Sequence, residues 1–370
     1  MKTAVTEMLD IALPIFAFSH CRDVVAAVSR AGGFGCLGAG YFTKDQLEEE
    51  LRWIDDHVDG KPYGVDLLMP NRHADLGSVK LDVHSVPQQQ VRFLRELLDA
   101  AHVPPLPRTE ADAMIEAEIA KVNMTREESE ALLDVALKHP IKMVVNALGV
   151  PSREQVERVH ALGIRVGALV GRVEHARKQR EAGVDVIVAQ GAEAGGHTGN
   201  ISSMILWPQV VDAVSPTPVL AAGGIGSGRQ MAAALAIGAS GIWCGSIWLG
   251  TRESDLLPEE KRALFAARAE DAVQTLSRTG KQCRVLRSKL TEAWEQPGAP
   301  PVLPMPLQTI ATMEARLRIA RGHAKDFMSP PVGQIVHSMS AETTVRQVIT
   351  DMLTEYSDAM DRLQGIISDG

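Results

Sequence analysis

The 370-residue sequence lacks the features of a membrane or nucleic-acid-binding protein. No apolar run approaches the roughly 20 residues that a membrane-spanning helix requires. No block of basic residues occurs, and the net charge of −8 argues against binding to a polyanion. The first ten residues include acidic side chains where a secretory signal would be apolar. We therefore expect a soluble, cytoplasmic protein with neither a membrane nor a nucleic-acid partner.

Cysteine motifs and the phosphate loop of many nucleotide-binding proteins are also missing. The four cysteines, Cys21, Cys36, Cys244 and Cys283, are widely separated and form neither a CxxC pair nor a metal-ligand spacing. We therefore expect reduced thiols and no bound metal. No GxxxxGK[ST] phosphate loop is present, and the glycines at 226 and 228 do not start a GxGxxG dinucleotide fingerprint, because residues 229 and 231 are Arg and Met. With 45% hydrophobic residues, however, the chain is able to bury a large core.

Short apolar runs alternate with helical segments along much of the chain. Eight runs are typical of buried parallel strands: 11–16, 34–37, 63–69, 141–147, 164–170, 184–190, 218–222 and 241–244. Helical spacing follows most of them and often ends at a glycine, as at Gly163, Gly183 and Gly238. This βα rhythm predicts an α/β fold, a (β/α)₈ TIM barrel built from residues 1–69 and 141–255.

Two regions depart from this rhythm. Residues 70–140 predict a helical insertion after the third strand, with helices over 88–101, 110–121 and 125–138. Residues 256–370 predict a mainly helical C-terminal extension packed on the barrel, with helices over 259–276, 307–320 and 341–363 and a proline-rich crossing at 296–306. We expect both regions to serve packing or contacts within a homodimer.

The sixth predicted strand ends in an unusual loop, Gln190–Gly199, with sequence QGAEAGGHTG. Its four glycines allow a ligand or another backbone to approach closely. His197 is the only group in this loop that gains or loses a proton near neutral pH. Because active sites of such barrels lie at the carboxyl ends of the strands, His197 is our candidate catalytic residue.

The last two predicted strands each end in a glycine turn. AAGGIGSG at 221–228 opens into a helix, and CGS at 244–246 follows the eighth strand. Backbone N–H groups in such turns, together with a helix N-terminus, form an anion site. The pair predicts a phosphate-bearing ligand, whose other end would reach Gln190 and Asp66 at the tips of neighbouring strands.

Three stretches of the chain resemble the nitronate monooxygenase family. They are PIFAFSHCRDVVAAVSRAGGFGCLGAG at 14–40, GVDVIVAQGAEAGGHTG at 183–199 and PVLAAGGIGSGRQMAAALAIGASGIWCGS at 218–246. The family consists of FMN-dependent TIM barrels and includes flavin-dependent enoyl-thioester reductases and NADH:quinone reductases. The resemblance implies FMN contacts at Ala17, Phe18, Asp66, Gln190, Gly195, Gly196, Gly223, Gly224, Trp243, Cys244, Gly245 and Ser246, and a catalytic role for His197.

The chain departs from the family pattern at two points. Asp66 stands where many members have asparagine, and an ionised carboxylate cannot donate a hydrogen bond as an amide does. Nitronate-oxidising members place tyrosines and a lysine near the substrate, whereas the tyrosines of this chain are Tyr41, Tyr63 and Tyr356. The sequence alone does not assign any of these three tyrosines to the site.

The resemblance implies oxidation of alkyl nitronates with O₂ to carbonyl compounds and nitrite. The alternative is an NAD(P)H-dependent flavin reductase or dehydrogenase of quinones or of enoyl-CoA and acyl-carrier thioesters, with the 70–140 insertion shaping the entrance for a bulky acyl group. A third hypothesis is a non-redox barrel, an isomerase or synthase that binds a phosphorylated sugar. All three require a small-molecule substrate.

Overall fold

The structure, a computed structural model, describes residues 1–69, 82–123 and 125–368, and its centre is a closed barrel of eight parallel strands. The strands, in barrel order, are β1 (Ile15–Ser19), β2 (Phe34–Gly38), β3 (Tyr63–Leu67), β4 (Met143–Asn146), β5 (Arg165–Val170), β6 (Val186–Gln190), β8 (Val219–Ala222) and β9 (Gly241–Cys244). β9 pairs with β1 and closes the ring. The predicted (β/α)₈ TIM barrel is confirmed.

Alternate side chains of the strands fill the inside of the barrel. Phe16, Phe34, Met143, Val188 and Leu220 belong to one buried apolar cluster there. This cluster also includes residues of α1 (Ala4–Leu9), which joins it from outside the strands. The intervening side chains face outward to the helices and form the larger cluster. The inside of the barrel is therefore a packed core, and a ligand can enter only at its end.

In the described part of the chain, seven helices cover the barrel. They are α2 (Arg22–Arg30), α3 (Lys44–His57), α6 (Arg126–Ala136), α7 (Arg153–His160), α8 (Val173–Glu181), α9 (Ser203–Val214) and α10 (Gly228–Ala236). Capping boxes begin several of them, at Thr43, Thr125 and Ser152. α6 packs on α3 and β3, so the last part of the 70–140 region supplies the barrel helix that follows β3.

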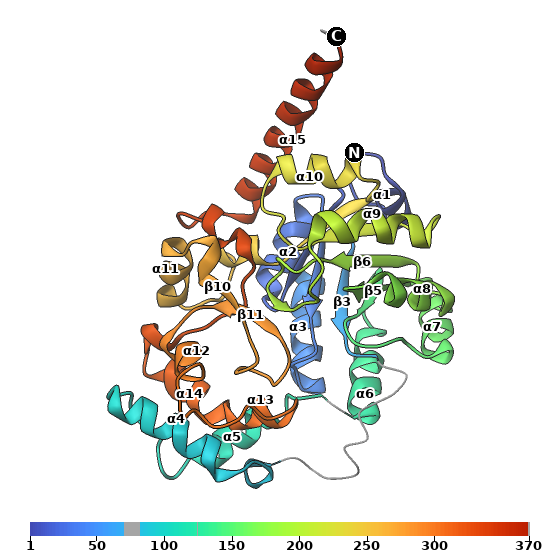
Figure 1. Cartoon of the computed structure of the whole chain (residues 1–370). Helices are drawn as coiled ribbons and strands as arrows, with labels where there is room; N and C mark the ends of the chain where they lie inside the picture. The colour runs from blue at the N-terminus through green and yellow to red at the C-terminus, as the bar shows by residue number, and fades with distance from the viewer. Residues whose placement is uncertain (70–81, 124, 369–370) are drawn as a thin grey trace.

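Further helices form a second layer, seen at the lower left of Figure 1. It contains α4 (Gln88–Ala100), α5 (Ala111–Ile119), α12 (Lys289–Ala293), α13 (Leu307–Ala311) and α14 (Met313–Arg321), with short 3₁₀ turns η1 (Val83–Ser85) and η4 (Lys325–Phe327). Apolar residues from both parts, such as Leu94, Leu98 and Ile319, pack in shared clusters. Segments more than 150 residues apart in sequence thus build one helical layer.

The prediction of one helix over 259–276 was wrong. α11 (Pro258–Ala266) ends early, and after η3 (Ala269–Asp271) the chain forms β10 (Ala272–Thr275) and β11 (Cys283–Leu286). β11 pairs antiparallel with β10 and with β7 (Gly196–His197) in a separate three-stranded sheet. The predicted helix over 307–320 is divided at Thr312 into α13 and α14. Strand pairing with distant segments overrides the local helical tendency.

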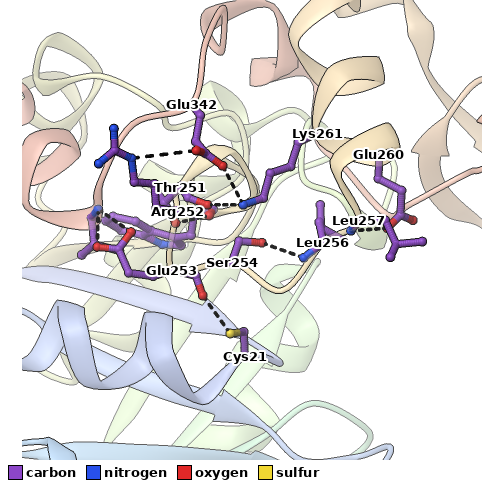
Figure 2. A network of polar contacts seen from close by, with 12 residues as sticks. Cys21, Thr251, Arg252, Glu253, Ser254, Leu256, Leu257, Glu260, Lys261 and Glu342 are labelled. Carbon is purple, nitrogen blue, oxygen red and sulfur yellow. Dashed lines mark hydrogen bonds and ion pairs between the residues drawn. The ribbon is translucent and has the colours of Figure 1, made fainter.

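The chain ends in a long helix, α15 (Val345–Ser368), which packs on α10 and extends away from the body of the molecule (Figure 1). Figure 2 shows the polar contacts between the loop after β9, α11 and Glu342, which lies just before the start of α15. Lys261 donates to the Thr251 carbonyl at 2.7 Å and to Glu342 at 3.1 Å, and the Val345 N–H donates to the Glu253 carboxylate at 3.1 Å. Two 3₁₀ turns, η2 (Ser246–Gly250) and η5 (Gln334–Ser338), lie in contact beside this network.

Among the helices that the structure describes, none is both long and apolar enough to cross a bilayer.

Candidate functional site

Four of the predicted contact residues lie in the last layer inside the barrel, at its carboxyl end. Phe18 and Trp243 are in van der Waals range, with ring centroids 6.2 Å apart, and both join the interior cluster. Side chains alternate between the two faces of a strand, and Val65 of β3 and Ile187 of β6 face outward. Asp66 and Gln190 are therefore the last residues of β3 and β6 whose side chains face into the barrel. The barrel therefore brings these four side chains to one end of its core.

Ala17 and Cys244 point the other way. Both side chains are buried in the outer cluster, between strands and helices. Burial raises the pKa of the Cys244 thiol to about 12, so this thiol stays protonated at neutral pH. Only the backbone of these two residues is available to a ligand at the barrel end.

Asp66 has an unmet hydrogen-bonding group. Its carboxyl is buried, and Oδ2 has no partner in the part of the chain that the structure describes. Burial raises the pKa of Asp66 well above its ordinary value. A protonated carboxyl donates a hydrogen bond as an amide does, which reduces the difference between Asp66 and the asparagine of the family pattern.

The loop that carries His197 is held in place on several sides. Arg284 of β11 donates to the Ala192 carbonyl at 2.9 and 3.1 Å. Glu193 accepts from the Ser203 hydroxyl at 2.7 Å, and its carbonyl accepts from the Gln334 N–H at 2.9 Å. These contacts connect the loop to β11, to α9 and to η5. The sequence analysis did not single out Glu193 or Arg284.

Two of the loop glycines have separate reasons to be glycine. A Cβ on Gly195 would lie 2.7 Å from the backbone of Val332. Gly196 has a φ of +75°, a conformation that other residues adopt at a cost. The first glycine allows the C-terminal segment to approach, and the second turns the chain into β7.

His197 contacts Thr279, a residue that the sequence analysis missed. Its Nε2 lies 2.8 Å from Thr279 Oγ1, and that hydroxyl is placed to donate to the Lys281 carbonyl at 3.2 Å. With the hydroxyl hydrogen used in this way, Nε2 is the donor and Nδ1 carries the lone pair. His197 Nδ1 makes no hydrogen bond with the described residues, so it is free to accept a proton.

Burial, and secondarily the nearby cations Lys281 and Arg278, lower the pKa of His197. The side chain nevertheless has an exposed surface. At neutral pH the lowered pKa leaves this imidazole in its neutral, basic form.

The turn after β8 forms a compact backbone cradle. Gly223 and Gly224 have φ values of +95° and +72°, and a Cβ on Gly223 would lie 2.9 Å from Ser203 Oγ. The Gly223 carbonyl oxygen lies 2.8 Å from that hydroxyl oxygen and shares its hydrogen with the Glu193 carboxylate. Within the described chain, the N–H groups of Gly224 and Ile225 donate to no other group. Such free amides in a glycine turn are suited to an anion.

The N-terminus of α10, which we expected to join this anion site, is occupied by its own chain. The Gly228 N–H donates to the Glu355 carboxylate of α15 at 2.9 Å, and the Gly226 N–H donates to the Gln230 side chain at 2.8 Å. The Gln230 N–H is capped by Ser227 at 3.3 Å. The helix opening therefore contributes little, and the glycine turn itself carries the donors.

The turn after β9 lies next to the same loop. Ser246 Oγ accepts from the Gly333 N–H at 2.8 Å and keeps its own O–H available to donate. A Cβ on Gly333 would lie 2.6 Å from the Glu193 carbonyl, and one on Gly224 would lie 3.1 Å from the Glu193 side chain. The three loops after β6, β8 and β9 thus converge around Glu193.

The three tyrosines have different positions. Tyr41, after β2, lies 3.4 Å from the guanidinium of Arg316 at the helical layer. Tyr63 donates to Asp55 at 2.6 Å, and Tyr356 packs against the outer cluster from α15. Tyr41 is the one that follows a strand at the carboxyl end of the barrel.

The sequence profile of the family described as "Nitronate monooxygenase" matches residues 2–355. The chain is similar to a provisionally named monooxygenase of Mycobacterium tuberculosis, with 45% identity over 99% of this chain and 100% of that protein. A provisionally named nitronate monooxygenase of Staphylococcus haemolyticus is 32% identical over 79% of this chain and 80% of its own length.

Two solved structures are similar over nearly the whole chain. Nitroalkane oxidase from Streptomyces ansochromogenes superposes with a TM-score of 0.79 and 29% identity, covering 98% of this chain and 100% of that one. FabK from Thermotoga maritima gives a TM-score of 0.75 and 25% identity, covering 99% of each chain.

Proposed function

On the premise that this chain belongs to the nitronate monooxygenase family and is a monooxygenase, we propose that it uses FMN to oxidise alkyl nitronates with O₂, giving carbonyl compounds and nitrite. The observation that carries the proposal is the position of His197. A neutral imidazole with a free Nδ1 stands on a fixed loop beside two glycine turns at the carboxyl end of the barrel.

The residues present fit an FMN cofactor. The free amides of the Gly223–Gly224 turn and the hydroxyl of Ser246 are suited to its phosphate. The unpartnered carboxyl of Asp66 and the side chain of Gln190 are suited to the polar edge of its ring. Phe18, Gly195, Gly196, Trp243 and Gly245, with the backbone of Ala17 and Cys244, complete the proposed contacts.

FMN, when bound, supplies the redox chemistry, in which electrons leave the substrate and are passed to O₂. The protein supplies binding, orientation and proton transfer. Nδ1 of His197 would take the α-proton of a neutral nitroalkane, or would orient a nitronate that has already lost that proton. Thr279 would hold the imidazole in the tautomer that this role requires.

The alternative activity remains an NAD(P)H-dependent flavin reductase of quinones or enoyl thioesters. The helical layer over the barrel end, where Arg316 of α14 reaches Tyr41, is compatible with a bulky substrate. The two activities differ in the electron donor. The monooxygenase is reduced by its nitronate, whereas the reductase is reduced by NAD(P)H.

The proposed reaction is tested by measuring one substrate and one product together. Purified protein with its bound cofactor is mixed with ethylnitronate, and O₂ uptake and nitrite release are recorded in the same sample. The proposal expects O₂ uptake and nitrite release to depend on the enzyme. Protein that contains flavin and leaves both at background would contradict it, and protein without any flavin would favour the non-redox hypothesis.

A further inference from the structure

His20, which the sequence analysis did not single out, follows β1 directly at the carboxyl end of the barrel. Its ring lies against Gly38, the last residue of β2. A Cβ on Gly38 would lie 2.8 Å from two atoms of the His20 ring and 2.7 Å from the ring of Phe18. Because side chains alternate along a strand and Leu37 faces outward, that Cβ would point into the barrel. The imidazole therefore occupies inner space that a side chain at position 38 would fill.

The His20 ring is held in one orientation. Its Nδ1 lies 2.7 Å from the Gly38 carbonyl oxygen, and because a carbonyl only accepts, Nδ1 carries the hydrogen. The ring also packs on that of Phe18, with centroids 5.1 Å apart and planes at 80°. Nε2 makes no hydrogen bond with the residues that the structure describes, and the side chain is exposed, so a ligand has access to this nitrogen.

His20 is in its neutral form at neutral pH. Loss of hydration among the surrounding protein atoms lowers its pKa, and the bond to Gly38 and the charge of Asp255 oppose this change without reversing it. Arg278 lowers the pKa further and does the same to that of His197. Both imidazoles thus lie in electrostatic range of one guanidinium, and each keeps one nitrogen with a lone pair available.

Asp66 is the neighbour of this imidazole along the rim of the barrel. Gly38, whose carbonyl binds His20, pairs with Asp66 of β3. Paired residues of parallel strands face the same side of a sheet, so Asp66 also points into the barrel. Because residue 38 has no side chain, β2 places nothing between His20 and Asp66 in this row. Within the described chain, Oδ2 of Asp66 is buried without a partner.

His20 and Asp66 together present complementary hydrogen-bonding groups. A neutral imidazole bonded through Nδ1 offers an acceptor at Nε2, and a protonated carboxyl offers a donor. An acceptor next to a donor matches an amide edge, in which an N–H lies beside a C=O. The pyrimidine edge of oxidised FMN has this form, with its one N–H between two carbonyl groups.

Another histidine has the same anchoring bond in a purely structural setting. Nδ1 of His57 lies 2.7 Å from the Trp53 carbonyl oxygen, one turn earlier on α3, and the two rings stack with centroids 3.9 Å apart. α3 leads into the amino end of β3, so His57 lies at the opposite end of the barrel from His20. The bond of His57 stays within its own helix, whereas that of His20 joins two strand ends and holds its ring inside the rim.

We propose that His20 contacts the FMN ring beside Asp66, with Nε2 accepting the hydrogen of the ring N–H and the Asp66 carboxyl bonded to the adjacent ring carbonyl. The inference rests on the proposed function, which supplies the cofactor, and it adds a residue to the contacts that the family resemblance implies. It also accounts for the glycine at position 38, because any side chain there would displace the imidazole.

The contact is tested with two cofactors that differ only at that N–H. Fluorescence titration of the flavin-free protein measures its affinity for FMN and for 3-methyl-FMN, in which a methyl group replaces the hydrogen. His20→Asn keeps an amide donor for the Gly38 carbonyl but has no group at the position of Nε2. We expect it to weaken FMN binding by about threefold to tenfold, the range for one hydrogen bond, and to leave the affinity for 3-methyl-FMN nearly unchanged.

A second variant and a control separate the contact from packing. If His20→Asn does not fold, His20→Phe keeps a ring beside Phe18 without either nitrogen, and should show the same selective loss. His57→Asn changes the matched histidine at the other end of the barrel and should bind both flavins as wild type does. A folded His20 variant that binds FMN as tightly as wild type, or that loses affinity for both flavins equally, would overturn the inference.

The outcomes also separate this inference from the proposed function. If wild type binds FMN and oxidises ethylnitronate but its FMN affinity does not depend on His20, only the inference fails. If FMN affinity depends selectively on His20 but no nitronate is oxidised, the contact stands and the proposed reaction fails. If wild type binds no FMN, both fail.

Discussion

His197 Nε2 and Thr279 Oγ1 lie 2.8 Å apart, and this contact joins the glycine loop after β6 to the turn between β10 and β11. It fixes the imidazole tautomer, since the hydroxyl of Thr279 is itself oriented by the Lys281 carbonyl. Thr279 is thus a positioning residue for the proposed base rather than a group that reacts.

Removing the hydroxyl of Thr279 should impair turnover without loss of flavin. We expect Thr279→Val to lower kcat/KM with a neutral nitroalkane by about threefold to tenfold, the range for one neutral hydrogen bond. Thr279→Ser, which keeps the hydroxyl, should restore most of the activity. Steady-state kinetics with flavin content determined for each variant measures this. Equal activity of the Val and Ser variants would show that the contact does not orient His197.

The pH dependence of activity should reflect the lowered pKa of His197. Burial and nearby cations disfavour the charged imidazolium, so the basic form persists below its ordinary pKa of about 6.5. With a neutral nitroalkane, kcat/KM should be constant near neutrality and fall only as the pH drops through a pKa below that value.

Lys281→Met removes one of those cations and should move this fall to higher pH by a fraction of a unit. Lys178→Met on α8, where the lysine pairs with Glu174, is the control and should leave the profile in place. A wild-type profile that falls above pH 6.5 would disagree with the electrostatics of this site.

Gly224 should be required for cofactor binding beyond its effect on folding. Gly224 has a φ of +72°, and Gly163, far from the site, has a φ of +71° with open space around it. Gly163→Ala should therefore destabilise the fold by about 1–2 kcal/mol, and Gly224→Ala by at least as much, because its Cβ would also lie 3.1 Å from the Glu193 side chain. Only Gly224→Ala should weaken FMN binding, as measured by fluorescence titration of the apoprotein. Equal FMN affinities would exclude this turn from the phosphate site.

Asp66 should make the stability of the flavin-free protein depend on pH. Because its pKa is raised in the folded state, its contribution to stability is complete below its ordinary pKa of about 3.9 and is lost as the pH rises through the folded value. Asp66→Asn is neutral throughout. The melting temperature of the variant, measured by scanning calorimetry, should therefore rise relative to that of wild type as the pH increases from 4 to 8. A constant difference would mean that Asp66 does not titrate in this way.

The barrel could be predicted because its signals are local. Each β-branched run and each glycine after a helix reports on its own unit, and eight such units in order determine the fold. The stretch from 267 to 275 has no such signal. Its residues favour a helix, and only pairing with β11 makes Ala272–Thr275 a strand.

The same distinction applies to the site. The turn at Gly223 and Gly224 and the loop at His197 are visible in sequence because glycines cluster at strand ends. Thr279 and Arg284 lie 82 or more residues after His197, and β11 brings them to it by pairing with β7. No local pattern in 272–286 indicates that pairing.

The most direct test of the central claim is anaerobic reduction of the bound flavin, which is monitored through the flavin absorbance near ~450 nm. The account predicts that ethylnitronate bleaches wild-type protein within the turnover time, that NADH does not, and that His197→Asn retains flavin but is slower with nitroethane by about a hundredfold or more. Rapid bleaching by NADH with none by a nitronate would contradict the account and identify the chain as a reductase.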